Sequence, residues 1–343
     1  MNRAELVDTL TLVGRALAET NLVPIHQCFM FRGRSVAAFN DQIGLIAPCK
    51  TSEAFAIHGP TLLGLLSNSQ GEDVEFTLEE HDCIIKTGRS TFKLPWFPET
   101  DFLIEEPEDK WHSKMALTDE ALKGISYCLP TASREDTQRA LNGVCFNGVT
   151  HTLYSCDGDV LTRYTLNKNM KAASVSLLPI AYCESLLKVA EAVGENTAFE
   201  LDVNHDWAKA EIGTYVVYGR LTENKTPFDF ANLVTKTLQS KPHYVAVPEG
   251  LNEALTRARV IADPETAKTA LAIEKGRLRL LTQTHHGIVR DSVPMPDHPD
   301  VEASVSSALV QRAIGLCNEM AIMDNATAYQ NGILFQLVSN MDK

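Results

Sequence analysis

CFMFRGRSVAAFN, residues 28–40, contains two short apolar runs around a polar turn, and this pattern decides the fold. The same outline returns as GVCFNGVTHTLYSCDG (143–158) and as TALAIEKGRLRLLTQT (269–284). In all three stretches glycine lies at or near the turn, where the backbone of a tight hairpin needs a positive φ angle. The three stretches therefore predict three β-hairpins in a repeated unit.

An amphipathic helix is predicted in front of each hairpin. Apolar residues recur there at intervals of three and four, on one face of each segment. Thr118 suits the N-cap of the second helix, and Pro248 stands near the first turn of the third. The apolar residues of the three faces are Leu6, Leu10, Val13 and Leu17; Leu122, Ile125 and Leu129; and Leu251, Leu255, Ala258 and Ala262.

The order of the elements after each hairpin is also repeated. A second apolar helix, entered from a short strand, follows the hairpin, and alternating strands then close the unit. The helices are expected within 55–69, 174–193 and 301–317, and the strands within 74–94, 198–221 and 319–338.

The repeat predicts an α+β protein of three domains, 1–110, 111–240 and 241–343. In each domain we expect a curved antiparallel sheet backed by two helices. The segments 99–112 and 235–244 are polar, contain proline and have the length of linkers,. A chain of 343 residues is long enough for two or three domains,.

The composition limits the possible partners. The net charge of −13, from 31 basic and 44 acidic residues, argues against a protein that is basic all over,. It does not exclude positive charge confined to one surface. No apolar run could span a bilayer, and the N-terminal residues show no secretory cleavage pattern. The eight cysteines form no C-x-x-C pair, which argues against a zinc site,. We therefore expect a cytoplasmic protein with reduced thiols and no membrane partner.

Most catalytic motifs are absent: there is no phosphate-binding loop, dinucleotide fingerprint, zinc-protease helix or nucleophile elbow. Asp157 and Asp159 frame an Asp-Gly-Asp segment that is either part of a carboxylate metal site or a turn,. Cys156 is either a nucleophile or a buried thiol. His285 and His286 are either metal ligands or a pair at a strand end. The turn, the buried thiol and the strand-end pair are favoured, so no catalytic, metal or cofactor site is predicted.

Three stretches carry a resemblance to a known family: TGRSTFKLPWFPETDF (87–102), LNGVCF (141–146) and LYSCDGDVL (153–161). In them the chain resembles the bacterial DNA polymerase III β subunit, the sliding clamp or processivity factor. In that family a Gly-Arg-Ser strand ends the first domain with a leucine and a later Asp-Phe. A Leu-Asn-Gly strand and an Asp-Gly turn follow in the second domain. The motifs are specific over residues 85–165, and the rest of the chain matches as architecture.

The resemblance implies three clamp domains in each chain and a head-to-tail homodimer that closes into a ring. Such a ring encircles double-stranded DNA without sequence preference and binds a DNA polymerase and a clamp loader. It tethers the polymerase for processive synthesis and carries no catalytic step and no cofactor. Two alternatives stay open: a clamp-fold adaptor that does not encircle DNA, and a metal-dependent enzyme that uses Asp157 and Asp159. Because the chain departs from the family pattern, it stays open whether such a clamp would serve the replication of a bacterial host or of a phage.

Basic residues on the polar faces of the repeat helices are the candidates for facing DNA. Weak phosphate contacts that ignore sequence would let a ring slide. Glu120, Glu184 and Glu253 lie on the same helices and interrupt a continuous basic surface. The candidates are Arg15, Lys123, Arg134, Arg139, Lys188, Arg257, Arg259 and Arg312.

The resemblance also implies an apolar pocket between the second and third domains, where peptides of the polymerase and the clamp loader dock. The family has His-Arg after the Asp-Gly turn, whereas this chain has Asp159 and Val160, which leaves the peptide specificity open. The pocket residues carried over are Leu141, Cys156, Gly158, Leu161, Leu233, Leu337 and Val338.

Overall fold

The structure is a computed structural model that describes residues 1–20, 22–101, 113–158, 160–166, 175–194, 199–203, 206–221, 228–239, 241–262, 268–315, 317–323 and 332–336. Its contacts divide the chain into two compact units, Met1–Phe228 and Asp229–Lys343. The first unit holds the first two predicted hairpins, and the second unit holds the third. The predicted boundary between residues 110 and 111 lies outside the described residues, so the division into three domains stays a prediction.

The N-terminal part of the first unit begins with helix α1 (Arg3–Val13). Asn2 caps this helix, because its side-chain oxygen accepts a hydrogen bond from the backbone N–H of Glu5 (3.1 Å),. The hairpin predicted at 28–40 is confirmed as β1 (Cys28–Arg32) and β2 (Ser35–Phe39), with Gly33 in the turn at a φ of 70°. The other elements are η1 (Gly14–Ala16), η2 (Pro24–Gln27), β3 (Ile43–Pro48), β4 (Ala54–His58), α2 (Gly59–Ser67), β5 (Glu75–Leu78), β6 (Asp82–Thr87), β7 (Ser90–Phe97) and η3 (Glu99–Asp101).

The rest of the first unit repeats this order. Thr118 caps α3 (Asp119–Cys128) as predicted, since its hydroxyl accepts from the backbone N–H of Ala121 (3.3 Å). The hairpin predicted at 143–158 is confirmed as β9 (Gly143–Asn147) and β10 (Thr152–Cys156). Its turn places a positive φ (53°) on His151. The other elements are β8 (Ser113–Leu117), η4 (Leu129–Thr131), η5 (Asp136–Leu141), β11 (Leu161–Thr165), β12 (Val175–Pro179), α4 (Ile180–Val193), β13 (Phe199–Val203), β14 (Trp207–Ile212) and β15 (Tyr215–Arg220).

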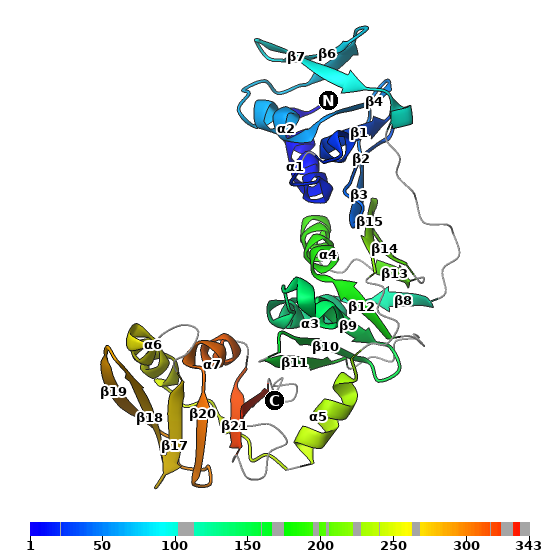
Figure 1. Cartoon of the computed structure of the whole chain (residues 1–343). Helices are drawn as coiled ribbons and strands as arrows, with labels where there is room; N and C mark the ends of the chain where they lie inside the picture. Colours follow the sequence, from blue (N-terminus) through cyan, green and yellow to red (C-terminus); the bar gives the residue numbers. More distant parts are fainter. Residues whose placement is uncertain are drawn as a thin grey trace. The chain divides into compact units, whose positions relative to one another are not determined.

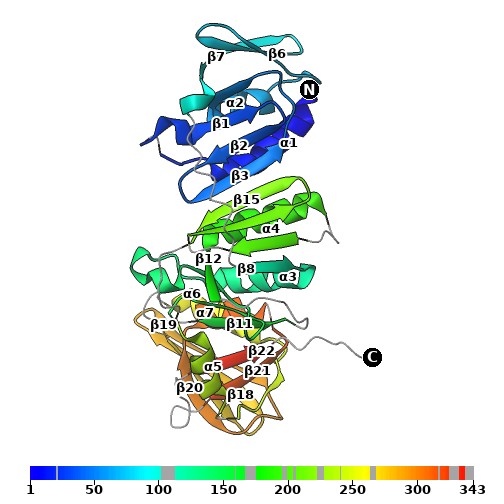
Figure 2. The ribbon, with the colours of Figure 1, turned by 90° about the vertical axis from the view of Figure 1, so that its right-hand side faces the viewer.

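One sheet runs through both parts of the first unit (Figures 1 and 2). Its strand order is β5-β6-β7-β4-β1-β2-β3-β15-β14-β13-β8. The antiparallel pair β3 and β15 joins the two parts, with Leu45 opposite Val217 and Ile43 opposite Gly219. A smaller sheet has the order β11-β10-β9-β12. The backbone hydrogen bonds of β3 and β15 thus make one sheet of strands that come from two repeats.

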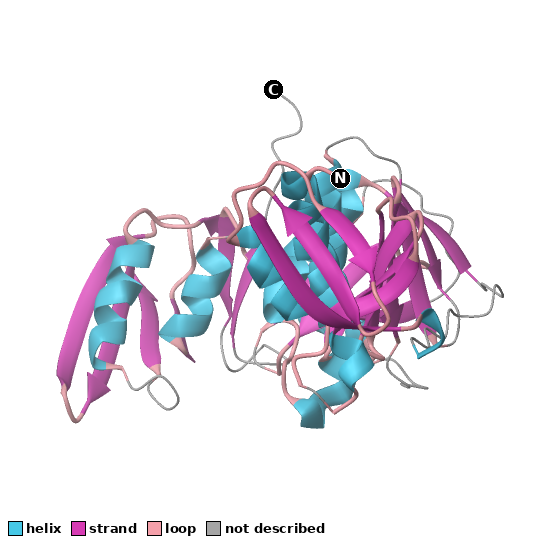
Figure 3. Ribbon diagram, turned by 90° about the horizontal axis from the view of Figure 1, so that it is seen from above, coloured by secondary structure: helices cyan, strands magenta, loops and turns pink. Residues whose placement is uncertain are grey.

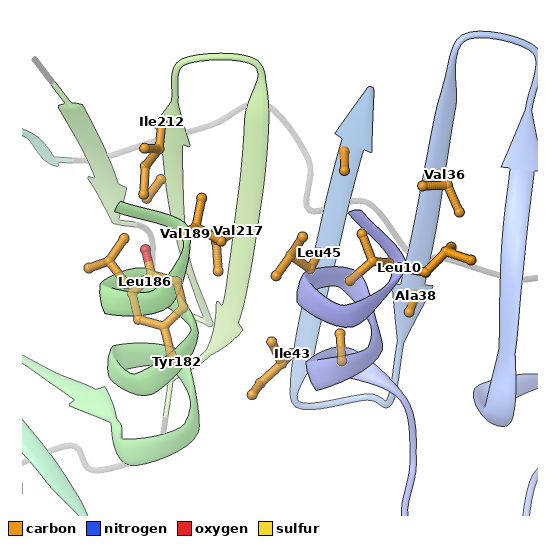
Figure 4. Packing of buried hydrophobic residues seen from close by; sticks show 14 of the residues in the cluster. Leu10, Val36, Ala38, Ile43, Leu45, Tyr182, Leu186, Val189, Ile212 and Val217 are labelled. Carbon is orange, nitrogen blue, oxygen red and sulfur yellow. The ribbon is translucent and has the colours of Figure 1, made fainter. Parts of the chain in front are cut away.

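Four helices form a layer against these sheets. Helix α1 contacts α2 and α4, and α4 contacts α3, so the order in the layer is α2, α1, α4, α3. Leu10 of α1 and Tyr182 of α4 are both fully buried (0% exposed) in the same core. Figure 4 shows Leu10 of α1 beside Leu45 of β3, and Tyr182 of α4 on the side of the neighbouring strand β15, which carries Val217. The hydrophobic core is therefore continuous across the junction of the two repeats.

The second unit shows the same combination of hairpin and helices (Figures 1 and 3). The hairpin predicted at 269–284 is confirmed as β17 (Thr269–Glu274) and β18 (Arg277–Thr284), with Gly276 at a φ of 73°. Helix α6 (Leu251–Ile261) packs on β18 and on β19 (Gly287–Pro294), and α7 (Ser307–Ile314) packs beside α6. Pro248 and Ala262 flank α6 and are not part of it. The other elements are α5 (Phe230–Leu238), β16 (Val245–Ala246), β20 (Val301–Val305), β21 (Glu319–Met323) and β22 (Gly332–Gln336).

Helix α5 corrects the predicted linker at 235–244, because the helix continues to Leu238. Phe230, Val234 and Leu238 recur every four residues, which is the amphipathic signal for this helix,. The polar residues that follow them made the segment resemble a linker. None of the helices in the described part of the chain has the length and apolar character needed to cross a membrane.

Candidate nucleic-acid interface

The helix layer of the first unit has an exposed surface on the side away from the sheet. Leu6, Leu10 and Val13 place one face of α1 in the core, and Ile125 and Leu186 do the same for α3 and α4. Polar residues at the intervening positions of a helix point the other way. That outer surface carries the predicted DNA-facing residues on α3 and α4.

Arg15 and Arg134 meet at one carboxylate on this surface. Arg15 belongs to η1, at the end of α1, and Arg134 lies between η4 and η5. Glu184 of α4 accepts a hydrogen bond at Oε1 from Nη2 of Arg134 (2.8 Å). The other oxygen of Glu184, Oε2, lies 3.9 Å from Nη2 of Arg15. Two predicted DNA-facing arginines therefore share a single negative partner.

Two lysines lie elsewhere on the same layer. Nζ of Lys188 is 2.7 Å from Oε2 of Glu191, one turn further along α4. Lys123 of α3 is exposed, and its ammonium lies 5.9 Å from the centre of the Tyr127 ring, a cation–π distance,.

Arg139, by contrast, is exposed on the short helix η5 and not on one of the α-helices. The prediction that every candidate lies on a repeat helix is thus wrong for Arg134 and Arg139, and Arg15 lies on the short helix η1 that follows α1.

In the second unit, α6 and α7 carry the exposed Arg257, Arg259 and Arg312. Arg257 pairs with Asp291 of β19, with 2.6 Å between Nη2 and Oδ2. Nη1 of Arg259 donates to the side-chain oxygen of Gln311 on α7 (2.6 Å). These contacts hold the guanidinium groups of Arg257 and Arg259 on the surface of the helix pair.

The ion pairs reduce the positive charge that the basic residues of the helix surfaces present to solvent. Arg15, Arg134, Lys188 and Arg257 each have a carboxylate partner. Exposed ion pairs of this kind contribute little to stability, but each carboxylate lowers the positive charge that a phosphate would meet. Together with the net charge of −13, this arrangement suits weak contact with a polyanion and does not suit tight binding.

Four predicted pocket residues lie near one end of the β10–β11 pair. Cys156 ends β10 opposite Leu161, the first residue of β11. Gly158 between them has a φ of 98°, and its N–H donates to Sγ of Cys156 (3.3 Å). Leu141 ends η5, and the side chain of Gln138 in η5 lies 3.8 Å from the position that a Cβ on Gly158 would take. The structure thus brings Cys156, Gly158 and Leu161 together and places η5 beside them.

The remaining pocket residues cannot be placed in the same way. Leu233 is part of α5, but its side chain lies outside the described residues. Leu337 and Val338 lie outside them altogether. The pocket as a whole stays a prediction.

The Asp157 side chain has a structural role in a turn. Its Oδ1 accepts from the N–H of Val160, three residues further on (2.8 Å), a local side-chain-to-backbone bond that stabilises the turn,. Asp159 lies outside the described residues. His285 and His286 are exposed in the turn between β18 and β19, with ring centres 3.8 Å apart. Within the described ranges, no three or more His, Cys, Asp or Glu side chains are grouped closely enough to hold a metal ion.

Of the three thiols Cys128, Cys145 and Cys156, the first two are buried. Burial raises the pKa of Cys128 to about 12, and it raises the pKa of Cys145 to about 12 as well. A thiol with such a pKa is not ionised near neutral pH and is a poor nucleophile. Cys156 is half-buried and holds the turn through the hydrogen bond from Gly158.

Solved DNA sliding clamps match the fold of nearly the whole chain. A DNA polymerase sliding clamp from Pseudomonas aeruginosa matches with a TM-score of 0.86 and 16% identity, over 99% of this chain and 95% of that one. A sliding clamp (DNA polymerase III subunit beta) from Bartonella birtlesii gives 0.86 and 18%, over 98% of both chains. The DNA polymerase III beta subunit from Thermotoga maritima gives 0.81 and 19%, over 95% and 93%. The chain has the sliding-clamp fold, and the predicted α+β class is confirmed.

Sequence comparison also finds a sliding clamp, at low identity and over part of the chain. The beta sliding clamp of Proteus mirabilis is 21% identical over 219 residues, or 62% of this chain. The matched region spans 57% of the length of that curated relative. No family model matches the chain. The predicted resemblance to the bacterial β subunit is therefore confirmed in the fold and, at low identity, in the sequence.

Proposed function

We propose that this protein is a DNA sliding clamp, a homodimeric ring that encircles double-stranded DNA and tethers a replicative polymerase. The full-length match to the sliding-clamp fold carries this proposal. The continuous layer of α2, α1, α4 and α3 supports it, because such a layer can line the inside of a ring. Tethering keeps the polymerase at a high effective concentration near the DNA. It needs no catalytic step and no cofactor.

The edges of two sheets support closure of the ring. Within the described residues, β19 is the last strand of its sheet, and β7 pairs with β4 only at Trp96 and Phe97. Unpaired strand edges tend to pair with another chain. The pair β3 and β15 already joins two repeats in this way. We therefore expect β19 of one copy to pair with β7 of the other, with the exposed Ile288 (52%) at the interface.

The other parts of the proposal follow from this function. Each chain would supply three clamp domains, the arginines and lysines of the helix surfaces would face the DNA, and the protein would act in the cytoplasm. The residues at the β10–β11 end, with Leu233, Leu337 and Val338, would receive peptides of the DNA polymerase and the clamp loader. The half-buried apolar side chains of Leu141, Cys156 and Leu161 support this role, since binding sites are lined mainly by apolar side chains,.

Retention on DNA circles tests the topological function. A clamp loaded on nicked circular DNA should stay bound in salt that disrupts ordinary phosphate contacts, and it should be lost once the circle is linearised. Ion pairing alone would give the same retention on both DNA forms. Equal retention would refute encirclement and leave the clamp-fold adaptor.

Light scattering tests the dimer. Because one chain has a mass of 37.8 kDa, the proposed dimer should be measured as a particle of twice that mass. Ile288→Asp places a charge at the proposed interface and should shift the particle to the monomer mass. Val149→Asp changes a residue that is also exposed (65%) but lies in the turn between β9 and β10, and it should leave the dimer intact. A wild-type monomer at micromolar concentration would refute the ring.

A further inference from the structure

We propose that Glu184 weakens the hold of the helix layer on DNA, because it partly neutralises Arg15 and Arg134. This inference rests on the proposed function and names a residue that tunes it. Each carboxylate oxygen of Glu184 lies next to a different arginine, at 2.8 Å from Arg134 and 3.9 Å from Arg15. The three side chains come from α4, from the segment after η4, and from η1 after α1.

Without a carboxylate between them, these two guanidinium groups would suit a phosphate. A guanidinium presents a planar set of N–H donors that matches phosphate oxygens and stays charged at every physiological pH. The Arg134 side chain is 67% exposed and that of Arg15 is 35% exposed, so both can reach a ligand in solvent. With Glu184 the group of three carries a net charge of +1, whereas the two arginines alone would carry +2.

The rest of helix α4 supports the same role. Its charged residues are Glu184, Lys188 and Glu191, so the helix itself carries a net charge of −1. Lys188 is already paired with Glu191 at 2.7 Å. Helix α4 lies between α1 and α3 in the layer. Helix α4, in the middle of the surface proposed to face DNA, therefore adds negative charge, and Glu184 is its acidic residue that lies next to two arginines.

The physical consequence is a weak dependence of DNA binding on salt. The slope of log K against log salt concentration is about −0.9 for each phosphate that the protein neutralises on duplex DNA. A carboxylate that competes with phosphate for the same guanidinium groups lowers that number. Few and weak phosphate contacts let a ring move along the duplex, so the Glu184 group favours sliding over static binding.

Glu184→Gln tests this, because glutamine keeps the size and a hydrogen-bond acceptor but removes the charge. In the full-length protein, affinity for a short linear duplex at low salt should rise about 2- to 5-fold, and the slope should steepen by about 1. Glu274→Gln is the matched control. It also breaks a Glu–Arg pair, with Arg279 at 2.8 Å, and gives the same change in net charge. Glu274 alternates with the buried Ile273 and therefore lies on the sheet face away from the core,.

Four outcomes are distinguishable. A steeper slope for Glu184→Gln that Glu274→Gln lacks, and that a further Arg134→Gln removes, supports the inference. An unchanged slope, with normal retention of the wild type on circular DNA, overturns the role of Glu184 and leaves the clamp function standing. Loss of topological retention by the wild type itself refutes the proposed function and this inference with it. A change in the melting temperature of Glu184→Gln with no change in slope shows a purely structural ion pair and also overturns the inference.

Discussion

Gly219 is the position where the junction between the two repeats is most sensitive to one added methyl group. It lies on β15 opposite Ile43 of β3 and packs under the ring of Tyr182. A Cβ built on Gly219 would lie 2.5 Å from Cγ and 2.7 Å from Cβ of Tyr182. Tyr182 is fully buried (0% exposed), so its ring has no free space to move into. Gly219→Ala therefore forces a shift in α4 or in β15.

The expected cost can be worked out from this geometry. Adding a methylene to a well-packed core costs about 1–3 kcal/mol. A unit of this size loses about 2–4 °C in melting temperature for each kcal/mol. We therefore expect Gly219→Ala to lower the melting temperature of the first unit by about 2–12 °C.

Gly64→Ala is the matched control, because the same chemical change should have the opposite sign. Gly64 lies inside α2, and a Cβ there would have nothing within 4 Å. Alanine is favoured over glycine inside a helix by about 0.8–1.0 kcal/mol. Gly64→Ala should therefore raise the melting temperature by about 2–4 °C.

Thermal unfolding followed by far-UV circular dichroism, with urea unfolding followed by tryptophan fluorescence, measures both variants. Trp207 is a suitable probe, since its ring centre lies 5.8 Å from that of Phe39 across the junction. A Gly219→Ala protein as stable as the wild type would refute the close packing of α4 on β15. Equal destabilisation by both substitutions would show that the loss at Gly219 does not come from its contact with Tyr182.

The remaining predictions concern one histidine, one leucine and one thiol. Burial lowers the pKa of His298, whose Nε2 accepts from the N–H of Ile322 (3.1 Å). The unfolded chain therefore binds a proton at this histidine more readily than the folded protein does. The stability that the neutral, buried His298 contributes is present above the ordinary histidine pKa of about 6.5, and it is lost as the pH falls through the lower pKa of the folded protein. The melting temperature of the second unit should drop below that pH, and a flat profile would contradict this. Leu10→Ala should destabilise the first unit by about 2–5 kcal/mol in urea unfolding, because Leu10 is fully buried, whereas Leu22→Ala, at an 89% exposed residue, should change stability by less than about 0.5 kcal/mol,. Since burial raises the pKa of Cys128 to about 12, iodoacetamide at pH 8 should modify it only after unfolding; rapid modification of the folded protein would contradict the buried position,.

The local elements were largely predictable from the sequence. Hairpins and amphipathic helices depend on the spacing of apolar residues and on turn chemistry within a few positions, so 28–40 and 269–284 fold as expected. The cap at Thr118 follows from the same local rules,. Helix α5 was missed because the polar residues after Leu238 concealed its apolar spacing. The turn before β10 takes its positive φ at His151, a residue type that gave no signal for it.

The candidate site was predictable in kind but not in arrangement. Basic residues between the apolar positions of the helices indicated a DNA-facing surface, and the structure places Lys123, Lys188 and Arg257 on exposed helix faces. Glu184 was recognised only as an interruption of that surface. Its contact with Arg15 and Arg134 joins residues that are far apart in the sequence, and no periodic pattern encodes such a pairing.

By itself, the sequence determined the repeated order of hairpins and helices, because these elements form from contacts between near neighbours in the chain. It also determined the net charge of −13 and therefore excluded a protein that binds DNA through an overall basic surface. Only the tertiary structure decided that β3 and β15 join two repeats into one sheet, and that Glu184 lies between two arginines. Both depend on how the helices and strands pack on a common core, which brings together residues that the chain itself keeps far apart.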